Sequence, residues 1–205
     1  MDDVNHTEAG SGRRGRVLRP ISPARLDEMA LAYVARFATS AGKLEAYLAR
    51  KLRERGFDGD GEPAQAIAAI LARFVAAGYV DDAGYARMRA GSLLRRGMGA
   101  RRIAQDLNMA GIGEDVRAQA MPGEAAARAA ALQLARKRGF GPFARLRGDG
   151  ASDAAPDASA DFARREKQVA AMLRAGHRLD MARAIIESPD AEAAQSWADE
   201  VRDEA

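Results

Sequence analysis

Residues 103–112 read Ile103-Ala104-Gln105-Asp106-Leu107-Asn108-Met109-Ala110-Gly111-Ile112, and this short stretch decides the fold class. Ile103 and Leu107 are spaced so that both lie on one face of an α-helix. Gly111 follows one turn later, where helices commonly end at a glycine in the left-handed conformation, and the apolar Ile112 then turns back toward the core. The stretch therefore predicts an amphipathic helix with a defined C-terminal end.

The same pattern occurs twice more in the chain. Residues 48–57 repeat it closely as Leu-x3-Leu-x3-Gly-Phe, and residues 168–177 repeat it less closely as Gln-x3-Met-x3-Gly-His. Each copy follows another helix with an apolar face, so the unit is three helices, used three times at intervals of about 55 to 65 residues. Because one such unit cannot bury its apolar face alone, neighbouring units stack. We therefore predict an all-α fold of tandem three-helix repeats, with three modules forming an elongated, curved array.

Helix caps and breaks in this pattern set the expected domain boundaries. Ser22 before Pro23, Ser40, and Asp81 are N-cap signals, and Gly78 ends the third helix. A run of Gly, Ala, Ser, Asp and Pro before the last copy has the composition of a flexible linker. We expect a disordered basic arm at 1–21, a first repeat at 22–78, a second at 79–122, a third at 123–188 with a flexible insert at 148–161, and an acidic C-terminal helix or tail at 189–205.

The composition excludes several classes of protein. The 205 residues are 47% hydrophobic but only 5% aromatic, which fits closely packed helices better than a large sheet. No apolar run approaches the roughly 18 residues that a membrane-spanning helix needs. There are no cysteines, so disulfides, thiolate nucleophiles and cysteine-bound zinc are excluded. The start of the chain does not resemble a signal peptide, and we expect a cytoplasmic protein with no membrane contact.

Positive charge is unevenly distributed, although the net charge is only +3. Residues 87–102 contain six arginines and no acid, and residues 128–147 contain five arginines and one lysine without an acid. Guanidinium groups grip phosphates and carboxylates bidentately, so these runs predict contact with DNA or with an acidic protein surface. The alternative is an ordinary solvated helix face in an arginine-biased chain. The candidate binding residues are Arg50, Lys51, Arg53, Arg55, Arg95, Arg96, Arg101, Arg102, Arg136, Lys137 and Arg138.

No set of residues suggests a catalytic, metal or cofactor site. His6 and His177 cannot form a metal site by themselves, and we expect a packing or surface role for His177, whose counterparts in the other repeats are apolar. Asp81 and Asp82 could be paired carboxylates, but helix capping and the positive end of the helix dipole explain them better. We therefore expect no enzyme, no metal, no cofactor and no small-molecule substrate.

Residues 78–86, Gly-Tyr-Val-Asp-Asp-Ala-Gly-Tyr-Ala, resemble the most recognisable stretch of the RecX family of recombinase regulators, which has Gly-Tyr-Leu-Asp-Asp followed by an aromatic-Ala pair. The resemblance covers about residues 24–187. It implies a tandem three-helix-repeat fold, binding in the groove of the RecA–DNA filament, and inhibition or remodelling of recombinase activity. The sequence departs from the family pattern at Gly84, which is usually polar or charged, and at His177, which is usually aromatic. The opening, middle and closing repeats of the family are matched by residues 30–57, 97–112 and 165–177.

Three functions remain open on the sequence alone. The main hypothesis is a regulatory protein that binds the RecA–DNA filament and inhibits recombinase and ATPase activity in DNA repair and recombination. The alternative is a helical-repeat protein that binds the DNA phosphate backbone directly without a recombinase partner, in which case affinity falls steeply with salt. A third option is an assembly scaffold whose apolar seams pack on a partner helix. We expect a monomer, since an open repeat array can work as a single copy.

Overall fold

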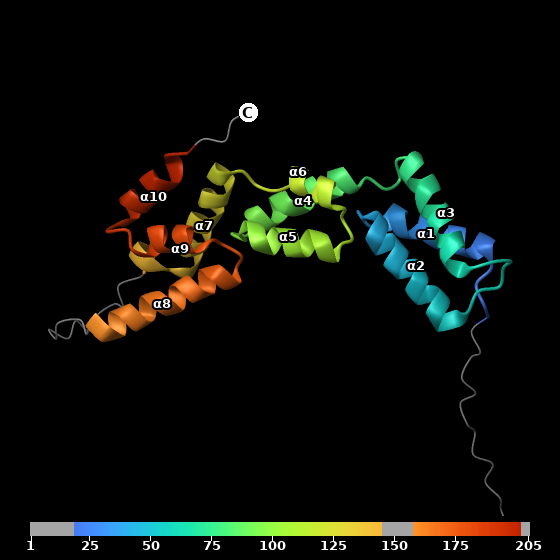
Figure 1. Ribbon diagram of the computed structural model, residues 1–205, viewed down its shortest axis with the longest axis horizontal. Coiled ribbons are helices and arrows are strands. Elements are labelled where there is room, and N and C mark those ends of the chain that lie inside the picture. Colours follow the sequence, from blue (N-terminus) through green and yellow to red (C-terminus); the bar gives the residue numbers. More distant parts are fainter. Residues whose placement is uncertain (1–18, 145–157, 202–205) are drawn as a thin grey trace, which may run out of the picture.

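The computed structural model describes residues 19–144 and 158–201, which form three groups of helices in a shallow arc (Figure 1). A short 3-10 helix, η1 (Gly141–Phe143), follows α7. Within the described ranges no strand forms, so the expected all-α fold is confirmed. No described helix is both long enough and apolar enough to cross a bilayer. The α-helices are α1 (Pro23–Arg36), α2 (Ala41–Arg55), α3 (Pro63–Ala76), α4 (Asp82–Leu94), α5 (Ala100–Met109), α6 (Glu114–Gln119), α7 (Glu124–Arg138), α8 (Ala158–Arg174), α9 (Leu179–Ile186) and α10 (Ala191–Asp199).

Side-chain caps fix the starts of three helices at the predicted residues. The Ser22 hydroxyl accepts a hydrogen bond from the backbone of α1, and the Ser40 hydroxyl accepts one from the backbone of α2, each at 3.3 Å. The Asp81 carboxylate accepts the Gly84 N–H of α4 at 2.9 Å. Each cap satisfies an N–H group that would otherwise have no partner in the helix.

The three repeat glycines end α2, α5 and α8 as the sequence predicts. Gly56, Gly111 and Gly176 have φ angles of +82°, +72° and +95°. Residues with a side chain rarely adopt this left-handed region, so glycine is required at these three turns. Phe57 and Ile112 then fold back against their own modules, whereas His177 contacts Gly97 of the second module.

Each group of helices has its own apolar core, and we call these groups modules. The first module is α1–α3, the second is α4–α6, and the third is α7–α10 with η1. The repeat positions Leu48, Ile103 and Met172 are fully buried in the three cores. Burial of each such side chain stabilises the fold by about 1.5–3 kcal/mol, so each module depends mainly on contacts within itself.

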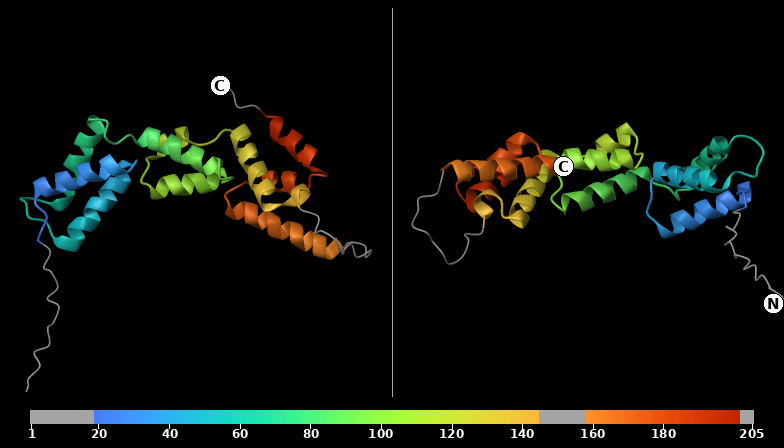
Figure 2. Two further views of the ribbon diagram at one scale, coloured as in Figure 1. Left: turned by 180° about the vertical axis from the view of Figure 1, so that it is seen from behind. Right: turned by 90° about the horizontal axis from the view of Figure 1, so that it is seen from below.

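Helices α2, α5 and α8 follow one another end to end along one side of the arc (Figures 1 and 2). At the first joint, between the first and second modules, the Ser40 hydroxyl donates to the Ala110 carbonyl at 2.5 Å. At the second joint, between the second and third modules, the Gly99 N–H donates to the Ala175 carbonyl at 2.9 Å. The start of α2 therefore meets the end of α5, and the start of α5 meets the end of α8.

Both joints need glycine because two backbones touch there. A Cβ atom on Gly42 would lie 2.7 Å from the Gly111 Cα, and a Cβ atom on Gly99 would collide with the Gly176 carbonyl. Such separations are well below van der Waals contact. The close approach lets the helix ends meet without an intervening side chain, and this sets the spacing of the modules.

Residues 19–21 cover the free end of the first module and do not belong to a disordered arm, which corrects the expected boundary at 21. Ile21 is fully buried and forms an isolated bridge with Phe57. Its N–H donates to the Gly56 carbonyl at 3.0 Å, and its carbonyl accepts the Asp58 N–H at 2.9 Å. The backbone edge at Gly56 is thus paired by a short extended segment. Residues 1–18 of the expected arm lie outside the described residues.

The third module is larger than expected, because α10 packs into it and is not a separate tail. Ala194 and Ala198 of α10 are buried in the same core as α7. Arg128 of α7 donates to the Trp197 carbonyl at 2.9 Å, and its guanidinium lies 4.4 Å from the centre of the indole ring. In addition, α8 begins at Ala158, so the last residues of the expected insert 148–161 are helical; the rest of it lies outside the described residues.

Candidate partner-binding surface

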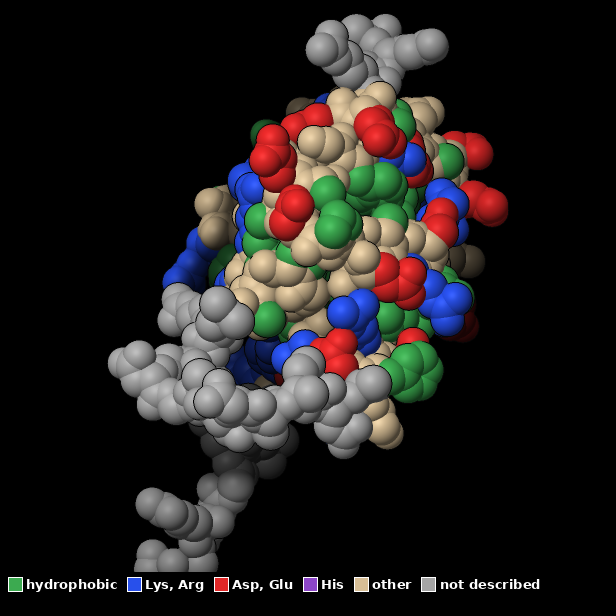
Figure 3. Space-filling model, turned by 90° about the vertical axis from the view of Figure 1, so that its left-hand side faces the viewer, with side chains coloured by type: hydrophobic (Ala, Val, Ile, Leu, Met, Phe, Trp, Pro, Cys, Tyr) green, Lys and Arg blue, Asp and Glu red, His purple; other side chains and the backbone are tan. Residues whose placement is uncertain are grey.

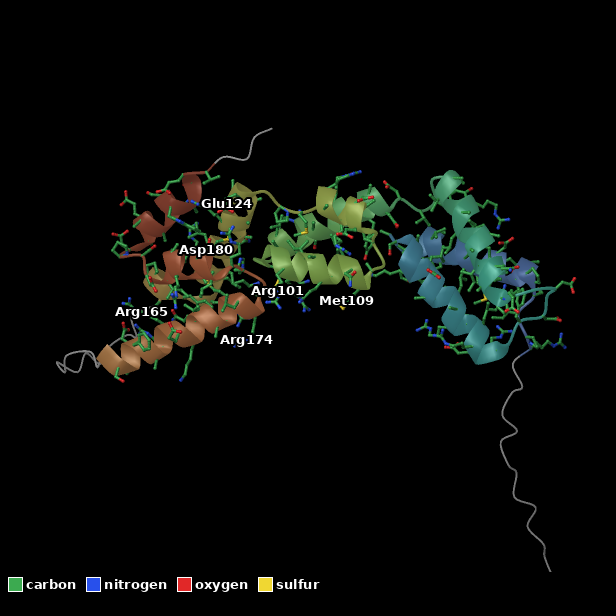
Figure 4. The ribbon with its side chains drawn as sticks, viewed as in Figure 1. Arg101, Met109, Glu124, Arg165, Arg174 and Asp180 are labelled. Atoms are coloured by element: carbon green, nitrogen blue, oxygen red, sulfur yellow. The ribbon has the colours of Figure 1, made fainter. Side chains whose placement is uncertain are left out.

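The outward faces of α2, α5 and α8 carry a row of cations. In each helix the repeat positions point into the core, so side chains on the opposite side face solvent. Figure 4 shows Arg174 at the end of α8 and Arg101 at the facing start of α5, with Arg165 toward the other end of α8. We call this surface the basic edge, and its residues, all exposed, are Arg50, Arg53, Arg101, Arg102, Lys167 and Arg174.

The cations of α2 are partly neutralised within their own helix. Glu54 lies 2.7 Å from Lys51 and 3.7 Å from Arg50. The hydrogen bond from Lys51, and then the charges of the nearby cations, lower the pKa of the Glu54 carboxyl below its usual value. Arg55 is directed to the covered end of the module, where it donates to the Arg19 carbonyl at 2.8 and 3.0 Å. Among the four α2 candidates, the exposed Arg53 therefore has the most freedom to meet a partner.

Arg101 and Arg102 occupy an unusual place for cations, since they stand in the first turn of α5. The positive end of a helix dipole disfavours cations there. At the second joint the negative end of α8 lies against this turn, and the Arg101 N–H donates to the Gly176 carbonyl at 3.2 Å. The α8 carbonyls thus offset the repulsion and allow two exposed guanidinium groups without an ion pair to any described carboxylate. These two residues are the best-placed anion ligands of the row.

Arg95 and Arg96 lie just before the same joint, at the end of α4, and both are exposed. The Arg95 carbonyl accepts a hydrogen bond from Gln133 of α7 at 2.8 Å, which fixes the backbone there. Arg95 and Arg96 thus lie before the turn at residues 97–99, and Arg101 and Arg102 lie after it. This local cluster was expected from the sequence as a candidate site, and the structure leaves all four side chains accessible.

Arg136, Lys137 and Arg138 form the last turn of α7, close to the place where that helix meets the second module. Gln133, one turn before Arg136, donates to the Arg95 carbonyl at 2.8 Å, and Gly97 packs against Leu134. Arg136 is directed to other elements, because it donates to Gln195 of α10 at 2.6 Å and lies 5.5 Å from the centre of the Phe143 ring. The three cations complement the negative end of the α7 dipole.

Arg89, within the arginine run 87–102, is a structural residue. Its guanidinium bridges α4 to α5 through two bonds to the Asp106 carboxylate, at 2.6 and 2.7 Å. The hydrogen bond from Arg89 lowers the pKa of the Asp106 carboxyl. Because Arg89 is paired with Asp106 and half-buried, it stabilises the second module and is not available to a partner. Fewer than the six arginines of residues 87–102 can therefore contribute to binding.

The residues that the sequence reading missed are on α8. Lys167 and Arg174 are exposed on the helix that continues the row. The repeat register contained a signal, because Lys167 stands at the position of Arg102 when residues 168–177 are aligned with 103–112. Beyond α8 the sign of the charge changes: Figure 3 shows acidic side chains spread over the upper part of this end, and α10 carries exposed Glu192, Asp199 and Glu200.

Asp81 and Asp82 act as caps. Asp81 caps its own helix, and Asp82 accepts the Ala41 N–H of α2 at 2.8 Å across the first joint. The described ranges contain no group of three or more histidine or acidic residues arranged to hold a metal ion.

His177 is a buried part of the second joint. One ring nitrogen, Nε2, lies 2.9 Å from the Gly97 carbonyl, and because a carbonyl only accepts, Nε2 carries the proton. The other nitrogen, Nδ1, is buried without a hydrogen-bond partner among the described residues. Desolvation lowers the pKa of His177 below its ordinary value of 6.5, although the bond to Gly97 opposes this. The second joint therefore favours the neutral form of the His177 imidazole over the protonated form.

Acidification is therefore expected to destabilise the second joint. Because the unfolded histidine takes up its proton at higher pH than the folded one, the His177 contribution is present above about pH 6.5 and is lost as the pH falls toward the lowered folded pKa. Urea unfolding of the wild type and of His177→Phe, measured from pH 7.5 down to 5, checks this. The wild type should lose stability relative to the variant on acidification. A constant difference between the two would contradict the prediction.

The fold and the site together define a class: an elongated helical-repeat binding protein that presents a basic edge. The second module, residues 81–121, matches the family model described as the second three-helix domain of RecX. A regulatory protein RecX from Myxococcus xanthus is 33% identical over 177 residues, covering 83% of this chain and 88% of the relative. The chain belongs to the RecX family of regulatory proteins.

Solved structures show the same fold. The crystal structure of RecX from Lactobacillus salivarius aligns with a TM-score of 0.58 at 16% identity, covering 87% of this chain and 97% of the other. A second crystal structure, of a regulatory protein RecX, also has a TM-score of 0.58, at 20% identity, and covers 80% of this chain. At these identities the likeness concerns the arrangement of the helices.

Proposed function

We propose that this protein binds the RecA–DNA filament in the cytoplasm and inhibits the recombinase and its ATPase. The observation that carries the proposal is the basic edge on an elongated array in a chain of the RecX family. A filament is long and repetitive, so an extended row of contacts suits it better than a compact patch does. Relatives named as regulatory proteins also support a regulator over an enzyme.

Under this proposal the arginines at the second joint make the central contacts. Arg101 and Arg102 are exposed and stand at the middle of the array, with Arg174 on one side and Arg53 on the other. They would meet acidic protein surface or DNA phosphates, both of which guanidinium groups bind bidentately. Arg136, Lys137 and Arg138 of α7 would be peripheral, because they lie outside the basic edge and Arg136 is bonded to α10.

The proposal is tested by measuring RecA-catalysed ATP hydrolysis on single-stranded DNA while this protein is titrated in. A regulator that acts on the filament should suppress hydrolysis at well below one copy per RecA subunit. Suppression only when the DNA is saturated would indicate competition for DNA and would overturn the proposal.

A direct DNA-binding protein without a recombinase partner is the second candidate, and the exposed row of cations favours it. Binding through phosphates releases counterions, so the logarithm of affinity should fall linearly with the logarithm of salt concentration. If DNA binding is the function, the slope should be steep and the Arg101→Ala, Arg102→Ala double variant should reduce it by about 2. A shallow slope in the wild type would count against this candidate.

A further inference from the structure

The first joint contains an apolar hollow that the basic edge does not include. It has a volume of about 270 Å³ and lies where α1 ends and the chain crosses from α3 to α4 (Figure 1). Three large apolar side chains line it and are about half exposed: Phe37 at 53%, Tyr79 at 58% and Met88 at 50%. Soluble proteins usually cover such clusters, and exposed aromatic and methionine side chains around one depression are typical of protein contact sites.

Two exposed cations lie beside rings that line this hollow. Arg36 lies 5.9 Å from the centre of the Phe37 ring, and Lys43 lies 5.2 Å from that of Tyr85. No described carboxylate pairs with either cation. In contrast, nearby arginines on the same helices are paired, as Arg89 is with Asp106. An apolar floor with a positive rim is complementary to an apolar side chain flanked by acids.

The first joint is also the weaker of the two. Described residues connect its modules through two side-chain hydrogen bonds, from Ser40 to Ala110 and from Ala41 to Asp82, together with the glycine contact. The second joint adds backbone bonds and the His177 contact, and the described residues form no backbone hydrogen bond across the first joint. Because Phe37 belongs to the first module, Tyr79 packs on Phe74 of the same module, and Met88 belongs to the second, an occupant of the hollow would bridge the two modules.

We propose that this hollow is a docking site for a segment of a partner protein in which an apolar or aromatic residue is flanked by aspartate or glutamate. The floor argues against a nucleic acid as the occupant, since Val34 and Met88 offer aliphatic surface. The Asp81 carboxylate of the lining is engaged in capping α4, where it accepts the Gly84 N–H at 2.9 Å. The inference goes beyond the proposed function, because it requires a type of segment and not RecA itself.

The test uses a fluorescein-labelled peptide with a Phe-Leu centre flanked by Asp and Glu, and measures its fluorescence anisotropy with the full chain. Binding is expected to the wild type, with about a tenfold loss in Met88→Ser and in the Arg36→Ala, Lys43→Ala double variant. Met109→Ser is the matched control, because Met109 is 69% exposed on α5 and lies outside the hollow (Figure 4). It should bind as the wild type does.

Three results would overturn the proposal. The first is that the peptide does not bind the wild type, or that a peptide with lysines in place of the acids binds equally well. The second is that Met88→Ser weakens binding of oligo-dT but not of the peptide, which would assign the hollow to nucleic acid. The third is self-association in analytical ultracentrifugation that Met88→Ser abolishes, which would assign it to a second copy. The peptide assay contains no RecA, so its failure and that of the ATPase test are separate.

Discussion

Replacing Arg101 and Arg102 together by alanine should weaken inhibition of RecA ATPase by about tenfold or more, since each tenfold corresponds to about 1.4 kcal/mol and charge-assisted contacts commonly supply that much. Both side chains are exposed and have no ion pair with a described carboxylate, so the change breaks no internal ion pair. Circular dichroism should show unchanged helicity. The measurement is the protein concentration that halves hydrolysis.

A matched double variant makes this result specific. Arg136→Ala with Arg138→Ala removes the same charge from the last turn of α7, which is outside the basic edge. If the basic edge is the site, this control should inhibit almost as well as the wild type. Equal loss in both variants would mean that net charge matters and not position, and unchanged inhibition in the first variant would remove the second module from the site.

The change Gly99→Ala should destabilise the protein by about 2–4 kcal/mol, through overpacking and the loss of hydrogen bonds across the second joint. Gly99 has φ −80° and ψ 167°, which any residue adopts, so backbone strain plays no part. The added methyl group would collide with the Gly176 carbonyl and push α5 away from α8. Thermal unfolding should show a lowered midpoint, and small-angle scattering should show an altered array.

Gly113→Ala is a close control for this variant. Gly113 is also the N-cap of a helix, with φ −58° and ψ 156°, but a Cβ atom there would have nothing within 4 Å. Both variants therefore lose a glycine N-cap, but only in Gly99→Ala does the added methyl group collide with another part of the chain. If Gly113→Ala were as destabilising as Gly99→Ala, the contact between α5 and α8 would not be what holds the second joint.

Much of the fold could be predicted because it depends on local signals. Ser22, Ser40 and Asp81 act on their own helices, and the repeat glycines end theirs, so a short window of sequence contains the information. Contacts between distant residues could not be predicted. Nothing near Asp82 indicates that it bonds to the start of α2, and nothing near Trp197 indicates that Arg128 holds it against α7.

The candidate surface was predictable to a similar extent. Runs of arginine identify candidate cations. The sequence does not show which of these arginines are neutralised by an ion pair. Arg89 is an example, because its partner Asp106 lies on the next helix. The sequence also does not show how distant runs meet, so the hydrogen bond from Gln133 of α7 to the Arg95 carbonyl could not be predicted. Close backbone approach at Gly42 and Gly99 was invisible for the same reason.

The short segment at Ile21 has a consequence for how long such proteins can become. The edge at Gly56 corresponds to those at Gly111 and Gly176, where the preceding module attaches, but here Ile21 already occupies its hydrogen-bonding groups. Residues 19–21 therefore act as a terminator that stops a further module from attaching in register before the first one. An array of this kind could gain a module only after the first, which leaves the terminator at the start of a longer array.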